Sequence, residues 1–205
     1  SCSAEEGVCT TFDGRGFPYT RNFHASVDTS AALTLSATGM RKKAILVVAV
    51  DVYSVGLYLS EAKDQSLKDK TTSDIFTSTP HSDEISTGVV LHFVRDVGTN
   101  KVVDAIVEAL LDSASVQEGG DNYKASVSSL QTVLLAAIGE AGMKKDDEIE
   151  FSFSGSEGTK IGVSVRDNFV ASLDDRLLRK KLGLIYAGAD AVAPEVPKIL
   201  QARYA

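Results

Sequence analysis

The sequence predicts an α+β fold in which a largely antiparallel sheet carries helices on one face. Strand-like segments are grouped with helical segments but do not alternate with them regularly, as they would in a parallel βαβ fold. The 205-residue chain is 43% hydrophobic, which is enough to bury a sizeable core. It has no internal repeat, linker or low-complexity tract. We therefore expect a single domain over residues 29–205, preceded by an N-terminal segment over residues 1–28.

The first part of the chain predicts strands. Residues 1–28 show no sustained period, which indicates coil or a short edge strand. A strand-like pattern begins at Ala31, and residues 44–55 are rich in β-branched side chains that favour strand over helix. Residues 61–88 are polar and rich in turn-forming residues, with a short helix expected around Ser73.

The middle of the chain predicts one strand and two helices. The run VVLHFV over residues 89–94 is strand-like. In TNKVVDAIVEALLDS the apolar residues recur at i, i+3, i+4, i+7 and i+8, with Thr99 as the expected N-cap. The segment DNYKASVSSLQTVLLAAIGEAG repeats this spacing, and Gly142 is the expected stop. Each helix should therefore bury one face.

The last part predicts a hairpin and two more helices. Residues 148–166 alternate apolar and polar side chains on both sides of the turn sequence SGSEG, which is typical of a hairpin with one inward face. DDRLLRKKLGLIYAG has acidic residues in its first turn and basic residues further along, as a helix dipole favours. The tail PEVPKILQARY is at most a short terminal helix.

Composition excludes several classes of function. A net charge of -7 argues against binding to nucleic acid or an anionic membrane, and no apolar run is long enough for a transmembrane helix, so we expect a soluble protein. We find no phosphate loop, zinc-ligand spacing or nucleophile elbow, and the three histidines, His24, His81 and His92, are scattered. The sequence therefore predicts neither a metal nor a cofactor.

The N-terminus leaves the compartment open. The cysteines, Cys2 and Cys9, could close one small loop in an oxidising compartment or be incidental thiols. The chain begins at Ser1 without methionine, which indicates a processed or trimmed N-terminus.

The stretch RKKAILVVAVDVYSVGLYL, residues 41–59, places an arginine and a tyrosine in an apolar strand. Arg41 and Tyr53 are twelve residues apart, so a straight strand would separate them by about 40 Å. A turn at the R-K-K sequence would bring them to one site; otherwise Arg41 is a solvated turn residue and Tyr53 a core aromatic. Regular alternation would place Asp51 on the face of Tyr53, where it would repel an anion, but a structural or surface role is expected for Asp51.

Four stretches carry recognisable motifs in order. They are GMRKKAILVVAVDVYSVGLYL, LHFVRDVGTNKVVDAIVEAL, MKKDDEIEFSFSGSEGTKIGVSV and LGLIYAGADAVAPEVPKIL. The first combines a Gly-x-Arg with the later residues Tyr53, Gly56 and Tyr58. Together, over roughly residues 33–200, they resemble the chalcone isomerase superfamily. The resemblance implies an open-faced β-sandwich, a large antiparallel sheet with helices layered on one face and a ligand cleft between them. It also implies a plastid location if the source is photosynthetic.

The resemblance also implies which residues to compare with the isomerases of the superfamily. Ring closure by a phenolate on an enone needs a cation, which Arg41 matches, and hydroxyl donors that polarise the ketone. The isomerases carry threonine at the position of Tyr53, a catalytic tyrosine at Val102 and an asparagine at Ala109, and Ser172 matches a small hydroxyl residue. Loss of the two polar groups on the helix removes donors worth about 100-fold each. We therefore expect no catalytic residues and no efficient cyclisation.

The fatty-acid-binding branch of the superfamily fits these positions better. Arg41 can bind a carboxylate in bidentate fashion and Tyr53 adds a hydroxyl, while Val102 and Ala109 make the cleft more apolar. We expect a non-catalytic protein that holds a medium to long acyl chain, with ligand-binding residues Arg41, Tyr53, Val102, Ala109 and Ser172. The alternatives are a ligand-free scaffold or partner protein of the same fold, or a weak chalcone-flavanone isomerase.

Overall fold

The computed structural model describes residues 16–45, 48–67, 84–154 and 159–204. Its strands are β1 (Thr20–His24), β2 (Ser30–Ile45), β3 (Val48–Leu59), β4 (Thr87–Phe93), β5 (Glu148–Ser154), β6 (Lys160–Val165) and β7 (Asn168–Asp174). Its helices are α1 (Glu61–Ser66), α3 (Thr99–Leu110), α4 (Ser113–Ile138), α5 (Arg176–Ala187) and α6 (Glu195–Tyr204).

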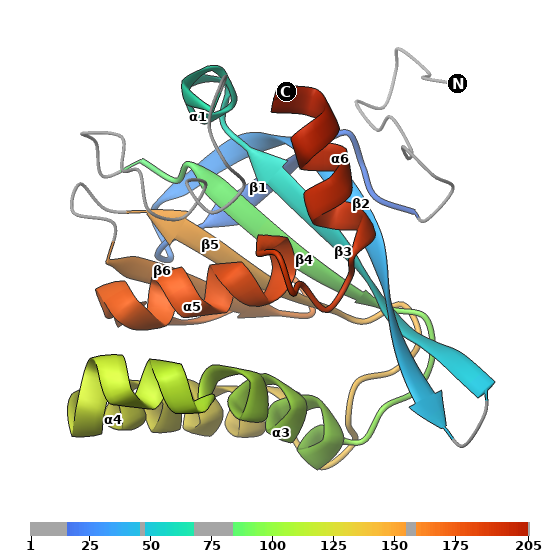
Figure 1. Cartoon of the computed structure of the whole chain (residues 1–205), viewed down its shortest axis with the longest axis vertical. Helices are drawn as coiled ribbons and strands as arrows, with labels where there is room; N and C mark the ends of the chain where they lie inside the picture. The colour runs from blue at the N-terminus through green and yellow to red at the C-terminus, as the bar shows by residue number, and fades with distance from the viewer. Residues whose placement is uncertain (1–15, 46–47, 68–83, 155–158, 205) are drawn as a thin grey trace.

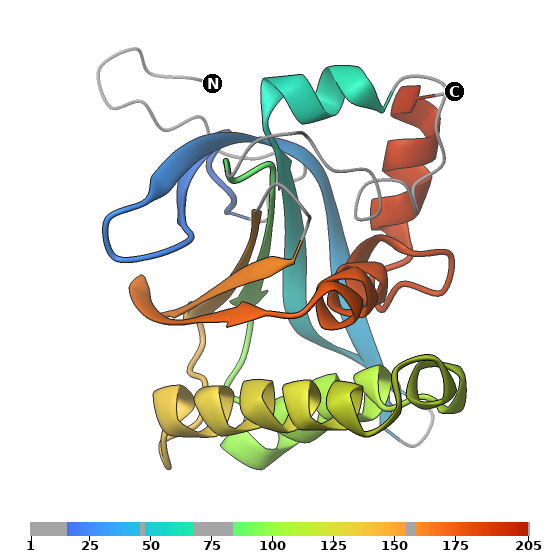
Figure 2. The same cartoon turned by 90° about the vertical axis from the view of Figure 1, so that its left-hand side faces the viewer.

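The strands form one sheet in which neighbours in sequence are neighbours in space. All six pairings, from β1–β2 to β6–β7, are antiparallel. The sheet curls into a half-barrel, so that β1 approaches β5 and β6 across its concave face, and the hydroxyl of Ser152 donates to the carbonyl of His24 at 2.5 Å (Figure 2). The helices lie on the other side of the sheet (Figure 1). The predicted α+β fold, an antiparallel sheet with helices layered on one face, is confirmed.

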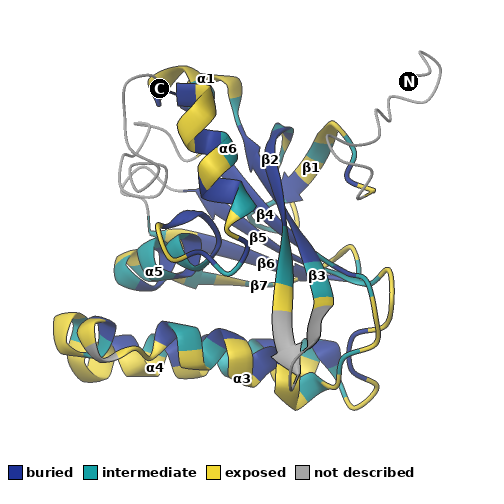
Figure 3. Ribbon diagram, turned by 45° about the vertical axis from the view of Figure 1, so that its right-hand side comes forward, coloured by how far each residue is buried: buried dark blue, intermediate teal, exposed yellow. Residues whose placement is uncertain are grey.

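The main core lies between the sheet and the helices. Strand alternation directs Val55, Leu57, Val89 and Leu91 toward it, as it does the apolar residues of the β5–β6 hairpin. The helices contribute their buried faces and keep exposed residues on the outside (Figure 3). Among their core residues are Val103, Ile106, Leu130, Leu134, Leu178, Leu182, Val196 and Leu200.

A smaller core fills the concave face of the half-barrel. Phe17 and Phe23 are fully buried there and pack with Tyr58. Glycine at position 88 makes room for the ring of Phe23, because a Cβ on Gly88 would lie 2.4 Å from that ring. At one end of this face Arg21 donates to carboxylates of β5, which ties the edge strand β1 to the centre of the sheet.

Several predicted elements are confirmed with shifted ends. The edge strand, the β5–β6 hairpin, and the helices α3, α5 and α6 occur where the patterns indicate. The N-cap of α3 is Gly98 rather than Thr99, whose hydroxyl donates instead to the carbonyl of Gly139. Helix α4 ends at Ile138, because Gly139, with φ of 69°, takes the stop position expected for Gly142.

Two expectations are wrong about where the chain turns. The R-K-K sequence is not a turn, because β2 continues through it to Ile45 and pairs with β3 from Val48. The segment 61–88 begins with the short helix α1, which is capped by Ser60. The polar composition of this segment did not indicate a helix there. The helix expected at Ser73 and the cysteines Cys2 and Cys9 lie outside the described residues.

Candidate ligand-binding site

A cavity of about 390 Å³ opens between the sheet and the start of α3. Strands β2 to β4 form one wall, α3 forms the opposite wall, and the segment between β4 and α3 forms the rim. Its apolar lining consists of Val52, Leu91, Phe93, Val97, Val102, Ala105 and Ile106. Its polar lining consists of Arg41, Tyr53, Arg95, Asp96 and Lys101. The cavity thus joins an apolar interior to a predominantly cationic set of polar groups.

The structure brings Arg41 and Tyr53 together directly. They are cross-strand partners in the β2–β3 ladder, and both side chains line the cavity. The ring of Tyr53 also contacts that of Phe93, with centroids 5.4 Å apart. Within the described residues neither the Arg41 guanidinium nor the Tyr53 hydroxyl makes a hydrogen bond or ion pair. Two strong donors are therefore left available at one rung of the sheet.

A β-bulge adapts β3 to this site. The register pairs Arg41 with Tyr53 and Lys42 with Asp51, so Val52 is an extra residue in the ladder. A bulge lets two consecutive side chains point to the same side, and Val52 and Tyr53 both line the cavity. The bulge also breaks the alternation that would have put Asp51 beside Tyr53. Asp51 is exposed, which agrees with the expected surface role.

The electrostatic environment keeps Tyr53 protonated. Burial raises the pKa of Tyr53 to about 12, although the nearby charge of Arg41 acts in the opposite direction. At neutral pH the phenol therefore keeps its proton and can donate a hydrogen bond to an anion. Arg41 supplies the positive charge and a planar fork of N–H donors.

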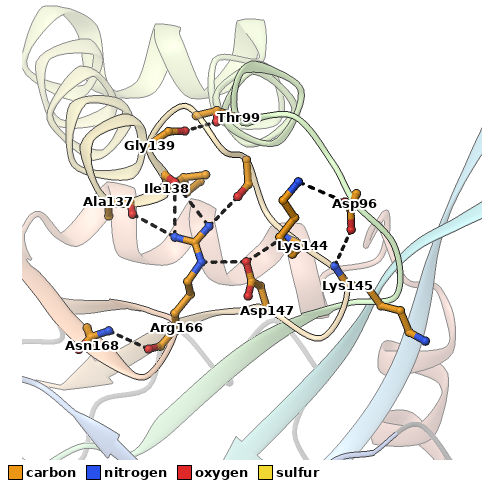
Figure 4. Close-up of polar contacts among 11 residues, drawn as sticks. Asp96, Thr99, Ala137, Ile138, Gly139, Lys144, Lys145, Asp147, Arg166 and Asn168 are labelled. Atoms are coloured by element: carbon orange, nitrogen blue, oxygen red, sulfur yellow. Dashed lines mark hydrogen bonds and ion pairs between the residues drawn. The ribbon is translucent and has the colours of Figure 1, made fainter.

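A polar network fixes the rim of the cavity, as Figure 4 shows. The carboxylate of Asp96 accepts from the Lys144 ammonium at 3.2 Å and from the backbone N–H of Lys145 at 2.9 Å. Next to it, Val97 forms a backbone bridge with Met143 in both directions. The segment after α4 therefore positions the segment that precedes α3.

Arg166 anchors the same network from the β6–β7 turn. Its guanidinium donates to the carbonyl of Gly142 at 2.6 Å and to the carboxylate of Asp147 at 2.8 Å. Longer contacts of 3.4 Å reach the carbonyls of Ala137 and Ile138 at the end of α4, where helical carbonyls lack partners. A single cation thus joins the helix end, the rim support and the sheet (Figure 4).

The other predicted site residues lie at different distances from the cavity. Val102 lines it from α3, together with Ala105 and Ile106. Ala109 is half-buried one turn further along α3, outside the cavity lining. Ser172 is exposed on β7, opposite Gly162, and is also outside the lining. Arg41, Tyr53 and Val102 are therefore brought together, and Ala109 and Ser172 are not.

Sequence reasoning missed several lining residues. Leu91 and Phe93 lie two residues apart in the predicted strand 89–94, so the sequence indicated that they share one face of the sheet. It did not indicate the cavity next to that face. Arg95 and Lys101 flank the expected start of α3, a signal that could have marked a cationic rim.

A second pocket, of about 360 Å³, lies at the polar end of the concave face. There the carboxylate oxygens of Glu148, Glu150 and Asp167 lie within 4.8 Å of one another, the only such cluster in the described part of the chain. The Arg21 guanidinium pairs with all three, at 2.5, 2.8 and 3.3 Å, so a protein cation already takes the position that a metal ion would need. This pocket is therefore a salt-bridge network rather than a metal centre.

Comparisons with known proteins agree with the fold. A family model described as chalcone isomerase-like matches residues 19–196. The crystal structure of a fatty-acid binding protein from Arabidopsis thaliana is similar, with a TM-score of 0.67 and 20% sequence identity, over 95% of this chain and 97% of that one. No curated protein matches the sequence. Across the described ranges, none of the helices has the length and apolarity needed to cross a membrane.

Proposed function

The chain belongs to the chalcone isomerase-like family, and we propose that it binds a fatty acid without catalysing an isomerisation. The observation that carries the proposal is the pairing of Arg41 with Tyr53 at the wall of an otherwise largely apolar cavity. A guanidinium and a phenol, neither of which bonds to another group in the described ranges, are the groups that a carboxylate needs. The similar fold of a fatty-acid binding protein agrees with this proposal.

The interior of the cavity suits an acyl chain. Leu91, Phe93, Val102 and Ile106 offer apolar surface from the sheet and from α3. Each methylene buried there contributes about 0.8 kcal/mol. The volume of about 390 Å³ is near the lower end of the range of about 300–1,000 Å³ for small-molecule sites, so medium chains should fill it best.

The residues of α3 argue against ring closure. Cyclisation needs hydroxyl or amide donors that polarise the ketone in the transition state. Val102, which lines the cavity, and Ala109, which lies two turns further along α3, have no polar side-chain atoms. The same side chains make the α3 wall more favourable for an alkyl chain.

Native mass spectrometry tests the proposal directly. The wild-type protein, purified and then delipidated, should take up decanoate at one molecule per chain, while Arg41→Ala should lose most of this occupancy. Arg203→Ala is the matched control, because Arg203 lies on α6, pairs with Asp64 of α1, and is outside the cavity lining. Equal occupancy of wild type and Arg41→Ala would refute the assigned site, and no occupancy of the wild type by any fatty acid would favour a ligand-free scaffold.

A spectrophotometric assay of chalcone consumption tests the absence of catalysis. Wild-type protein should not raise the rate measurably above that of the uncatalysed cyclisation. A rate well above it that also depends on Arg41 would establish an isomerase.

A further inference from the structure

The polar side chains of the cavity lie at two levels. Arg41, Tyr53 and Phe93 are ladder partners on consecutive strands, so they form one rung of the sheet. Arg95 follows Phe93 by two residues, a distance of at most about 7 Å along the chain. Lys101 lies in the first turn of α3 on the opposite wall, and both cations are exposed where they line the cavity. Arg95 and Lys101 therefore form the mouth, one level outside the rung of Arg41.

The inner end of the cavity is apolar. Leu91 and Ile106 line it there, and their exposed fractions are 0% and 3%. Leu91 precedes Phe93 by two residues on β4, on the side away from Arg95. Ile106 lies five residues beyond Lys101, which is about 7.5 Å further along the helix. The cavity therefore suits a single-chain amphiphile with its charged head at the mouth and its chain inside.

The mouth carries more positive charge than one carboxylate can neutralise. Among the described residues, none of the lining cations Arg41, Arg95 and Lys101 pairs with an acid. The acidic residue in the lining is Asp96, and its carboxylate pairs with the Lys144 ammonium at 3.2 Å instead. One fatty-acid carboxylate would match one of the three cations and leave two. This local excess occurs in a chain whose net charge is -7.

We propose that the cavity prefers a single-chain lipid whose head group is a phosphate monoester, with Arg95 and Lys101 binding its second negative charge. This inference rests on the proposed function, because the chain occupies the same cavity, and it adds the class of head group. At neutral pH a phosphate monoester carries a charge of about -1.5 to -2 and offers three acceptor oxygens. Arg41 and Tyr53 donate to it from the sheet, and the two cations of the mouth approach it from outside.

The apolar inner end restricts where the second charge can be. A dicarboxylic acid with one carboxylate at each end of its chain would place a charge against Leu91 and Ile106, where it would lose its hydration without gaining a partner. Both negative charges must therefore belong to one head group. A sulfate monoester has the same tetrahedral shape as a phosphate monoester and carries only one charge, so comparing the two isolates the second charge.

Isothermal titration calorimetry with decyl phosphate and decyl sulfate at about pH 8 tests the proposal, because the phosphate is then a dianion. Each exposed cation contributes up to about fivefold, so the wild type should bind the phosphate about tenfold more tightly than the sulfate. In the double variant with Arg95→Met and Lys101→Met this ratio should fall to about twofold or less. Both residues are exposed, so the variant should keep the melting temperature of the wild type.

Lys124→Met is the matched control, because it removes an exposed cation of α4 that is outside the cavity lining, and it should keep the wild-type ratio. Equal binding of decyl phosphate and decyl sulfate by the wild type, or an unchanged ratio in the double variant, would refute the inference. The proposed function would still stand if decanoate bound and Arg41→Ala weakened that binding. Failure of decanoate, decyl sulfate and decyl phosphate to bind the wild type would overturn both.

Discussion

Arg166 should contribute more to stability than other surface cations of this protein. The substitution Arg166→Met keeps the length of the side chain and removes its charge and donors. It breaks two short hydrogen bonds, to the carbonyl of Gly142 at 2.6 Å and to the carboxylate of Asp147 at 2.8 Å. The φ of 51° at this position disfavours both side chains to a similar extent, so backbone strain cancels in the comparison.

The magnitude follows from these contacts. Hydrogen bonds to charged groups contribute about 1.5–3 kcal/mol each. Because a third of the Arg166 side chain is exposed, solvent screening roughly halves this value, which leaves a loss of about 1.5–3 kcal/mol for the pair. In a chain of this size, 1 kcal/mol corresponds to about 2–4 °C, so the melting temperature should fall by about 3–12 °C.

Urea unfolding of the variant and the wild type measures this loss. Lys124→Met is the control, because it removes an exposed cation whose one ion pair with a described residue is with Asp121 on the same helix, and it should cost at most about 0.5 kcal/mol. Decanoate binding by Arg166→Met should also weaken, since Arg166 supports the segment that holds the cavity rim. A loss no greater than that of Lys124→Met would show that the network in Figure 4 adds no stability.

Two further predictions concern the concave face. The hydrogen bond to Glu148 raises the pKa of His92 above its ordinary value of 6.5, so its stabilising contribution is fully present below that value and is lost as the pH rises through the raised pKa. The difference in unfolding free energy between wild type and His92→Gln should therefore shrink as the pH rises above 6.5 and through the raised pKa, and a constant or growing difference would contradict this origin. Gly88→Ala should destabilise by about 1–3 kcal/mol through overlap with Phe23, as measured by urea unfolding. Adding Phe23→Leu should recover part of the loss, whereas simple addition of the two losses would rule out the overlap.

The elements that could be predicted from sequence are those with a strong local period. The β5–β6 hairpin alternates on both sides of its turn, and α3 repeats one apolar face. Strand β7 was missed because it is an edge strand whose residues alternate only between exposed and half-buried positions. The prediction misplaced the end of β2, because it put a turn at the R-K-K sequence, whereas β2 continues through it to Ile45.

The sequence predicted only the part of the site that lies on a single hairpin, formed by β2 and β3. Arg41 and Tyr53 came from the family resemblance, and the antiparallel register places them opposite each other. Ser172 and Ala109 depend on how β7 and α3 dock, which sequence spacing does not specify.

The bulge at Val52 has a consequence for aligning related sequences. A relative that lacks the residue equivalent to Val52 could still keep the tyrosine opposite the arginine. The other residues of its strand would then be shifted by one position relative to those of β3. An alignment without a gap there would then compare cavity-facing residues of one protein with solvent-facing residues of the other. The position equivalent to Asp51 is therefore best matched by its ladder partner, Lys42, rather than by counting along the strand, and Val52 is matched only where a relative also has the extra residue.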